Sequence, residues 1–291
     1  MLAYLVLGGL TSGALYALVA LGIVLVYKAT GTINFVHGEF LMISGFLAYT
    51  LYVIIGLPYL ASILGAVVLG FLLGMLAERV AFRPLMRANM VSLVLATVGV
   101  SFILKGCGRM LWGGRGDYLA FPPLLSPDPI IIGDIILVPQ QLVVLAGAAV
   151  VMVAFGLFFR LTRIGKTMQA TADNPKAARL VGVRVEQVHM LAFGVGAAVA
   201  GAAAALMAPI TLLYPDIGFA LFIKGFAAAV LGGLNSMGGA LLGGLIIGIV
   251  ESLAGGYIAT SFLEVSAFVV IMITLIFKPS GLLGSIAVRR A

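Results

Sequence analysis

Charged residues are scarce in this chain: Asp, Glu, Lys and Arg make up 9% of its 291 residues. Hydrophobic residues account for 63%, and the mean hydropathy is +1.23. A soluble domain of this length cannot bury so much apolar surface, so the composition predicts an integral membrane protein. The net charge of +7 does not indicate nucleic-acid binding, because the cations gather at the ends of apolar runs, as membrane topology requires.

Cysteine and histidine are almost absent. The single Cys107 excludes an intrachain disulfide framework and a multi-cysteine metal cluster. The only histidines are His37 and His189, and the chain has no HExxH motif and no pair of intramembrane acids at catalytic spacing. We therefore expect no catalytic residues and no metal site, and an intramembrane enzyme finds no support.

Long apolar runs dominate instead. A membrane-spanning helix needs about 20 apolar residues to cross roughly 30 Å of hydrocarbon, and these runs are too continuously apolar for a membrane barrel. The sequence predicts one domain over residues 1–291, an all-α polytopic transmembrane helical bundle. Glycine-rich runs after 30 and after 231 are typical of discontinuous helices, and either run also fits a half-helix that turns back, so eight or nine spans remain open. The nine candidates cover about 2–27, 33–56, 58–80, 90–106, 138–159, 188–214, 217–234, 238–257 and 262–277.

The distribution of Lys and Arg predicts the orientation. Thirteen cations lie in loops on one side of the predicted spans: Lys28, Arg79, Arg83, Arg87, Arg160, Arg163, Lys166, Lys176, Arg179, Arg184, Lys278, Arg289 and Arg290. Three lie on the other side: Lys105, Arg109 and Arg115. The positive-inside rule places the C-terminus in the cytoplasm and, with nine spans, the N-terminus outside.

The predicted external loop, 107–137, differs in amino-acid composition from the spans. Four prolines preclude a long helix, and Trp112, Tyr118 and Phe121 suit the membrane interface, where amphipathic rings settle. Two interpretations remain open: a docking surface for an external partner, or an interfacial loop that caps the bundle.

The longest polar interruption is the segment 160–186. Side chains from Ile164 to Ala172 favour a helix, and Asn174 followed by Pro175 is typical of the cap and first residue of a second helix. Gly182 is placed to end that second helix in the left-handed conformation. We expect a bent pair of short cytoplasmic helices, with Ala177, Ala178 and Val181 on one face of the second. A solvated connector is the alternative.

A few polar residues fall inside apolar spans, where ionisable groups need partners or water. Asn34, His37 and Glu39 lie within six residues, near the predicted cytoplasmic end of the second span, and favour a gate or a structural lock. Asn34 and His37 are three apart and would share a helix face, with Glu39 pointing elsewhere. Lys224 and Glu251 would bind a zwitterionic substrate, pair with each other or snorkel.

Small-xxx-small patterns occur at Gly239 and Gly243 and at Gly244 and Gly248, and predict close helix contact. Packing within the chain and an interface with a second subunit are both open.

Four segments carry a family resemblance. They are GTINFVHGEFLMISGF (31–46), AERVAFRPLMRANMVSLVLATVGVS (77–101), IGKTMQATADNPKAARLVGV (164–183) and KGFAAAVLGGLNSMGGALLGGLIIGIVES (224–252). Together the segments resemble the branched-chain amino acid permeases of ABC importers, and the likeness extends over essentially the whole chain. Chain length indicates the LivH-like subunit of the pair rather than the longer LivM-like one.

The resemblance implies an assembly in the bacterial cytoplasmic (inner) membrane. Its other members would be a LivM-like second permease, two cytoplasmic ATP-binding subunits and an extracytoplasmic substrate-binding protein. This chain has no GxxxxGK[ST] phosphate loop, so we expect it to bind no cofactor, with ATP and Mg²⁺ held by the partner ATPases. The residues implied to couple it to the ATPase are Gly165, Ala170, Asp173, Asn174, Lys176, Ala177, Ala178, Arg179 and Gly182.

The cargo stays open between branched-chain or hydrophobic amino acids and urea, short amides or other neutral amino acids. A secondary transporter outside the ABC class is a further alternative.

Overall fold

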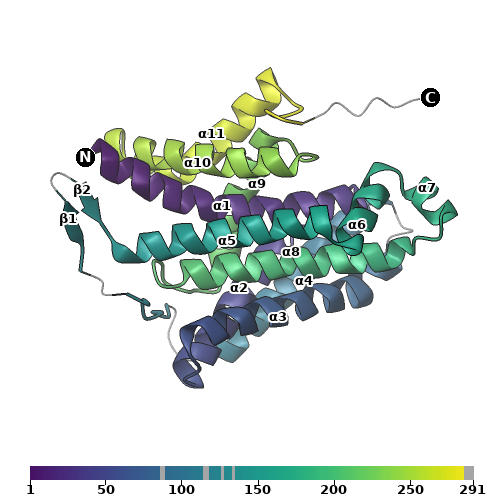
Figure 1. The fold of residues 1–291 in the computed structure, drawn as a ribbon, viewed down its shortest axis with the longest axis horizontal. Coiled ribbons are helices and arrows are strands. Elements are labelled where there is room, and N and C mark those ends of the chain that lie inside the picture. The colour runs from purple at the N-terminus through teal and green to yellow at the C-terminus, as the bar shows by residue number, and fades with distance from the viewer. Residues whose placement is uncertain (86–88, 114–117, 126–127, 133–134, 285–291) are drawn as a thin grey trace.

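The computed structural model describes residues 1–85, 89–113, 118–125, 128–132 and 135–284. The described chain is a helical bundle with one short hairpin (Figure 1). Its α-helices are α1 (Leu2–Thr30), α2 (His37–Tyr49), α3 (Tyr59–Ala77), α4 (Met90–Trp112), α5 (Pro139–Leu161), α6 (Arg163–Asp173), α7 (Pro175–Leu180), α8 (Val185–Met207), α9 (Ile217–Gly232), α10 (Met237–Tyr257) and α11 (Phe262–Phe277). Strands β1 (Ile130–Ile132) and β2 (Ile135–Leu137) pair antiparallel. Wider turns continue two helices, α2 through the π-helical η1 (Thr50–Ile54) and α3 through η2 (Glu78–Phe82), with the 3₁₀ turn η3 (Arg83–Leu85) after it.

The predicted helical membrane bundle is confirmed. Seven helices of the described chain are long and apolar enough to cross a membrane, and α9 and α11 are shorter apolar helices of 16 residues each. Each of these nine corresponds to one predicted run. Neither glycine-rich run forms a half-helix that turns back, because an 18-residue span (His37–Ile54) follows the turn at Gly31 and the 21-residue α10 follows the turn at Gly233.

The bundle has two distinct ends. In Figure 1 the N-terminus and the β1–β2 hairpin lie at one end, and α6 and α7 lie at the other. We call these the hairpin end and the α7 end. Residues 279 and 280, after α11, line a cavity with Tyr27, near the last turn of α1, so the last described segment lies toward the α7 end. This arrangement agrees with an odd number of crossings.

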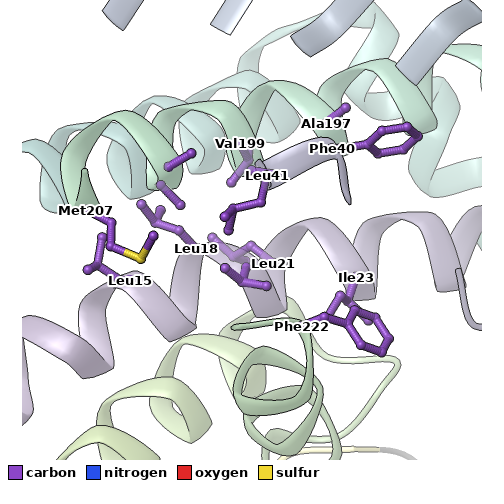
Figure 2. Packing of buried hydrophobic residues seen from close by; sticks show 14 of the residues in the cluster. Leu15, Leu18, Leu21, Ile23, Phe40, Leu41, Ala197, Val199, Met207 and Phe222 are labelled. Carbon is purple, nitrogen blue, oxygen red and sulfur yellow. The ribbon is translucent and has the colours of Figure 1, made fainter. Parts of the chain in front are cut away.

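Helix α1 forms the centre of the core. Its residues from Gly13 to Val26 are all buried, although a helix this apolar would be stable in lipid. Figure 2 shows Leu15 beside Met207 of α8, and Leu18 and Leu21 directed toward Leu41 of α2 and Val199 of α8. Because α1 is apolar on every side, contact with lipid would cost it nothing, so its burial depends on close packing against its neighbours.

Glycine permits the tightest contacts of α1. A Cβ atom built on Gly248 of α10 would lie 2.3 Å from the backbone nitrogen of Gly13 and the backbone oxygen of Gly9. On the opposite side of α10, a Cβ on Gly243 would lie 2.1 Å from the backbone oxygen of Ala228 in α9. Both small-xxx-small patterns therefore pack helices of this same chain together.

The predicted external loop is shorter than expected at its start, because α4 continues to Trp112. Trp112 and Phe121 are buried rather than interfacial: Trp112 stacks on Phe46, and Phe121 stacks on Tyr52. Leu119 exchanges two backbone hydrogen bonds with Leu213, at 2.8 and 2.9 Å. The described part of the loop thus packs against the bundle, and docking of an external partner stays a prediction.

We predict that Gly248→Ala lowers the free energy of unfolding by about 1–3 kcal/mol, because the added methyl overpacks the α1–α10 contact. The melting temperature of the purified protein in detergent measures this. Gly156→Ala is the matched control, since a Cβ at this α5 glycine meets nothing within 4 Å. An unchanged melting temperature for Gly248→Ala would contradict the close contact.

Candidate functional site

The break between α1 and α2 brings polar side chains into the core. Helix α1 ends at Gly31, which adopts a left-handed φ of 72°, and α2 begins only at His37. Between them, the Asn34 Oδ1 accepts a hydrogen bond of 3.1 Å from the Val36 backbone N–H. Asn34, His37 and Glu39 are all buried. Because Asn34 precedes the helix, the expectation that Asn34 and His37 share a helix face is wrong.

The start of α2 lies deep in the bundle. A Cβ built on Gly22 of α1 would lie 2.3 Å from Cε1 of the His37 ring. Gly22 lies eight residues before the end of α1 at Thr30, or about 12 Å along the helix. The expected place near the end of the span is therefore wrong. The fully buried His37 ring fills the space left by Gly22, beside the Val19 backbone, which favours the structural lock for this residue.

Glu39, in contrast, belongs to a charged cluster shared by three elements. Its Oε1 accepts a hydrogen bond of 2.9 Å from Ser101 of α4 and lies 3.9 Å from the Lys105 ammonium. Lys105 is 3.0 Å from Asp216, which precedes α9, and Arg109 donates to the other oxygen of Asp216 at 2.9 Å. We call Glu39, Ser101, Lys105, Arg109 and Asp216 the α4 cluster.

The two carboxylates of the α4 cluster differ in their surroundings. Glu39 is 1% exposed, and its Oε2 has no hydrogen-bond partner in the described part of the chain. Asp216 is 53% exposed, and the hydrogen bond from Lys105, with a second from Arg109, lowers its pKa below the ordinary value. The attraction between Asp216 and its two cations is therefore complete above the ordinary pKa of an aspartate. It is lost as the pH falls through the lowered pKa of Asp216.

Lys224 and Glu251 form a second, separate cluster. The Lys224 ammonium donates to Glu251 Oε1 and also to the Tyr16 hydroxyl, at 3.3 Å, so α9, α10 and α1 meet in one polar contact. The side chains are 19% and 8% exposed. Of the interpretations from sequence, the structure favours their pairing with each other.

Two cavities flank this ion pair. One, of about 460 Å³, is lined by Thr11, Gln140 and Glu251 among others. The other, of about 520 Å³, is lined by Tyr16, Tyr214 and Lys224. Glu251 lines only the first cavity and Lys224 only the second, so a solute in either cavity meets only one of the two charges.

The segment 160–186 folds as predicted. Helix α6 is capped by Thr162, which accepts from the Gly165 N–H at 3.0 Å, and α7 by Asn174, which accepts from the Ala177 N–H at 3.0 Å. Pro175 occupies the first position of α7, and Gly182, with a left-handed φ of 88°, lies in the turn that ends this helix. Figure 1 shows α7 as the outermost element of its end of the bundle.

The predicted coupling residues divide by exposure. Gly165 and Ala178 are buried within the chain, so the expectation that Ala178 shares an outward face with Ala177 is wrong. Seven of the nine are exposed: Ala170, Asp173, Asn174, Lys176, Ala177, Arg179 and Gly182. Leu180, 89% exposed, is a candidate that the sequence analysis missed, whereas Val181, 80% exposed, lies on the predicted face of this helix.

The members of the α4 cluster other than Glu39 were also missed. Lys105 and Arg109 were assigned to a loop because the apolar run ends early, yet both lie inside α4. Their spacing carried a signal: Ser101, Lys105 and Arg109 recur every four residues, which places them along one helix face. Asp216 had no such pattern, because it lies in a turn. Across the described residues, no group of three His, Cys, Asp or Glu residues is arranged to hold a metal ion.

Comparison with known proteins places these features in a wider group. Residues 5–277 match the model of a family described as branched-chain amino acid transport system/permease component. The high-affinity branched-chain amino acid transport system permease protein LivH of Salmonella typhimurium is 32% identical, covering 95% of this chain and 93% of that protein. BraD of Pseudomonas aeruginosa, of the same description, is 33% identical over 95% and 94%. The solved structure of PsaBC from Streptococcus pneumoniae in complex with Fab resembles the fold, with a TM-score of 0.55 at 15% identity over 94% of this chain and 91% of that one.

We predict that Lys224→Met lowers the free energy of unfolding by about 3–5 kcal/mol, because it leaves the buried Glu251 without its cation. The double variant Lys224→Met, Glu251→Gln should recover most of the loss, since both charges are then absent. Melting temperatures in detergent compare the single and double variants with the unmodified protein. Lys278→Met, which replaces an exposed lysine, is the control. A double variant no more stable than Lys224→Met would contradict the pairing.

Proposed function

Because the chain belongs to the family of permease components of branched-chain amino acid transport systems, we propose that it forms half of the translocation pathway of an ATP-driven importer for branched-chain, hydrophobic amino acids. The observation that carries this proposal is the identity of about one third to LivH and BraD, which extends over almost the full length of both proteins. The multi-pass helical bundle provides a body that spans the membrane. Its place would be the bacterial cytoplasmic membrane, with the α7 end and the C-terminus in the cytoplasm.

The chain would act without chemistry of its own. It has no phosphate loop, so ATP hydrolysis would take place on two partner subunits. A second, LivM-like permease would complete the pathway, and an extracytoplasmic binding protein would deliver the amino acid. In this scheme the permease changes shape, and the free energy for that change enters through the contact with the ATPase.

Helix α7 supports that contact. Its Asn174 cap and Gly182 stop hold a short, defined helix at the outermost point of the α7 end. The exposed Leu180 and Val181 supply an apolar anchor, and Lys176 supplies a cation beside it. Arg179 lies 3.7 Å from Glu186 in an exposed pair, which is weak enough to be exchanged for an acidic partner group. The buried Ala178 and Gly165 position the helix from within.

We expect proteoliposomes that hold this chain with its second permease and ATPases to take up leucine when supplied with the binding protein and internal ATP. Uptake should persist when the proton and sodium gradients are collapsed, because ATP hydrolysis drives it. Radiolabelled leucine, urea and acetamide distinguish the cargo classes. Leucine uptake without ATPase subunits would identify a secondary transporter instead, and uptake of urea or acetamide alone would overturn the amino-acid assignment.

We predict that Ala177→Arg abolishes ATP-driven uptake while membrane insertion stays intact, because the bulky cation prevents α7 from seating in its partner. Ala177 is exposed, so the chain itself tolerates the substitution. The readouts are uptake and the amount of ATPase that copurifies with the permease. Ala259→Arg, at an exposed position in the turn between α10 and α11, carries the same change and should transport normally. Normal uptake by Ala177→Arg would contradict the docking role.

A further inference from the structure

A polar stripe runs along one face of α4. Ser101, Lys105 and Arg109 are spaced four residues apart, and Glu39 and Asp216 oppose them from α2 and from the turn before α9. Ser101 is the middle residue of α4, and Arg109 lies about 12 Å farther toward the hairpin end. The α4 cluster therefore reaches from the middle of the membrane to one of its surfaces.

This face is not suited to lipid. Arg109 and Asp216 are 59% and 53% exposed, and Lys105 is 17% exposed. Charged groups inside a membrane segment are costly against hydrocarbon and normally face water or protein. The most apolar stretch of α4 is also only 11% buried, against 89% for α1. The charged face of α4 therefore adjoins water or protein rather than lipid.

The cluster has unused capacity for both charges of a zwitterion. The Glu39 Oε2 is buried and has no hydrogen-bond partner within the described chain, so Glu39 acts on an ammonium group beside the cluster through its negative charge. Lys105 and Arg109 share the exposed Asp216, and a carboxylate is the ligand these cations bind best. The Lys105 ammonium lies 5.8 Å from the ring centre of Phe219, which is 52% exposed and offers apolar surface beside the charges.

The Lys224–Glu251 pair lacks these properties. Each charge there has the other as a direct partner, Tyr16 adds a further hydrogen bond, and both side chains are more than four-fifths covered. A substrate would have to break this buried ion pair before binding, and the charge left behind would be buried without a partner. At the α4 cluster, the substrate carboxylate needs only to exchange with a half-exposed aspartate.

We propose that the α4 cluster forms the wall of the translocation pathway and holds a zwitterionic amino acid in transit. The carboxylate of the amino acid exchanges with Asp216 on Lys105 and Arg109, its ammonium group is attracted by the charge of the buried Glu39 without contacting it, and its apolar side chain lies along Phe219. The identity of the cargo rests on the proposed function. The position of the aqueous route along α4 does not.

Water access along α4 is measured first, since it is independent of the cargo. In a Cys107→Ala background, which removes the native cysteine, Lys105→Cys and Arg109→Cys are exposed to a charged, membrane-impermeant thiosulfonate in the assembled transporter. Ile103→Cys is the matched control, because Ile103 is 64% exposed but lies about half a turn from Ser101. We expect labelling at positions 105 and 109 to be at least tenfold faster than at 103.

Transport separates a substrate contact from a structural ion pair. Lys105→Gln should lower leucine uptake at least tenfold at equal yield of the assembled complex. The double variant Lys105→Gln, Asp216→Asn leaves one acid, Glu39, and one cation, Arg109, so its melting temperature should exceed that of Lys105→Gln, which leaves two acids against one cation, while uptake stays low. Lys278→Gln, which removes a cation outside the α4 cluster, should transport normally.

Either of two results overturns the proposal: labelling of Ile103→Cys as fast as Lys105→Cys and Arg109→Cys, or normal uptake by the double variant. If positions 105 and 109 label selectively but the unmodified transporter takes up no leucine, the cargo assignment fails while the route along α4 stands. If the unmodified transporter takes up leucine but positions 105 and 109 do not label, the route along α4 fails while the cargo assignment stands.

Discussion

Close backbone contact around α1 is the interaction on which the rest of this structure depends. An apolar helix gains nothing from burial when its alternative is lipid, so association must come from packing at short range. Glycine at Gly9, Gly13, Gly244 and Gly248 allows α1 and α10 to approach until backbone atoms touch. The same approach brings Tyr16, on α1, within reach of the Lys224–Glu251 pair. The glycine contacts between α1 and α10 therefore also determine where Tyr16 meets the Lys224–Glu251 pair.

A second close contact places the α4 cluster. A Cβ on Gly38 would lie 2.4 Å from the backbone oxygen of Gly218, and a Cβ on Gly218 would lie 2.3 Å from that of Gly38. This crossing brings the first turn of α2 to the start of α9. Glu39 follows Gly38 directly and Asp216 precedes Gly218 by two residues, so the backbone contact brings both acids to Lys105. Larger residues at either glycine would separate the acids from their cation.

Much of this could be predicted from the sequence, because the strongest signals were local. Nine apolar runs, the Asn174 cap and the Gly182 stop depend on neighbours in the chain, and each was confirmed. The depth of the second-span motif was not local. The expectation placed His37 near a membrane surface by its distance from Lys28, whereas the non-helical stretch after Gly31 carries the chain back along α1 to Gly22. Ala178 was misplaced because a six-residue helix is too short for periodicity to identify its buried side.

The two charged clusters differ in burial, and this difference, which the sequence does not reveal, separates a structural ion pair from an accessible one. Each joins a lysine to a carboxylate inside a membrane, and composition alone makes them equivalent. At Lys224 and Glu251, three helices close around the pair, so its charges serve the fold. At Lys105, Arg109 and Asp216, the helices leave one side open, and Glu39 keeps an oxygen without a partner beneath them. Under the proposed route the two clusters divide the work: the open charges along α4 contact the zwitterion, and the closed Lys224–Glu251 pair joins the helices in lipid.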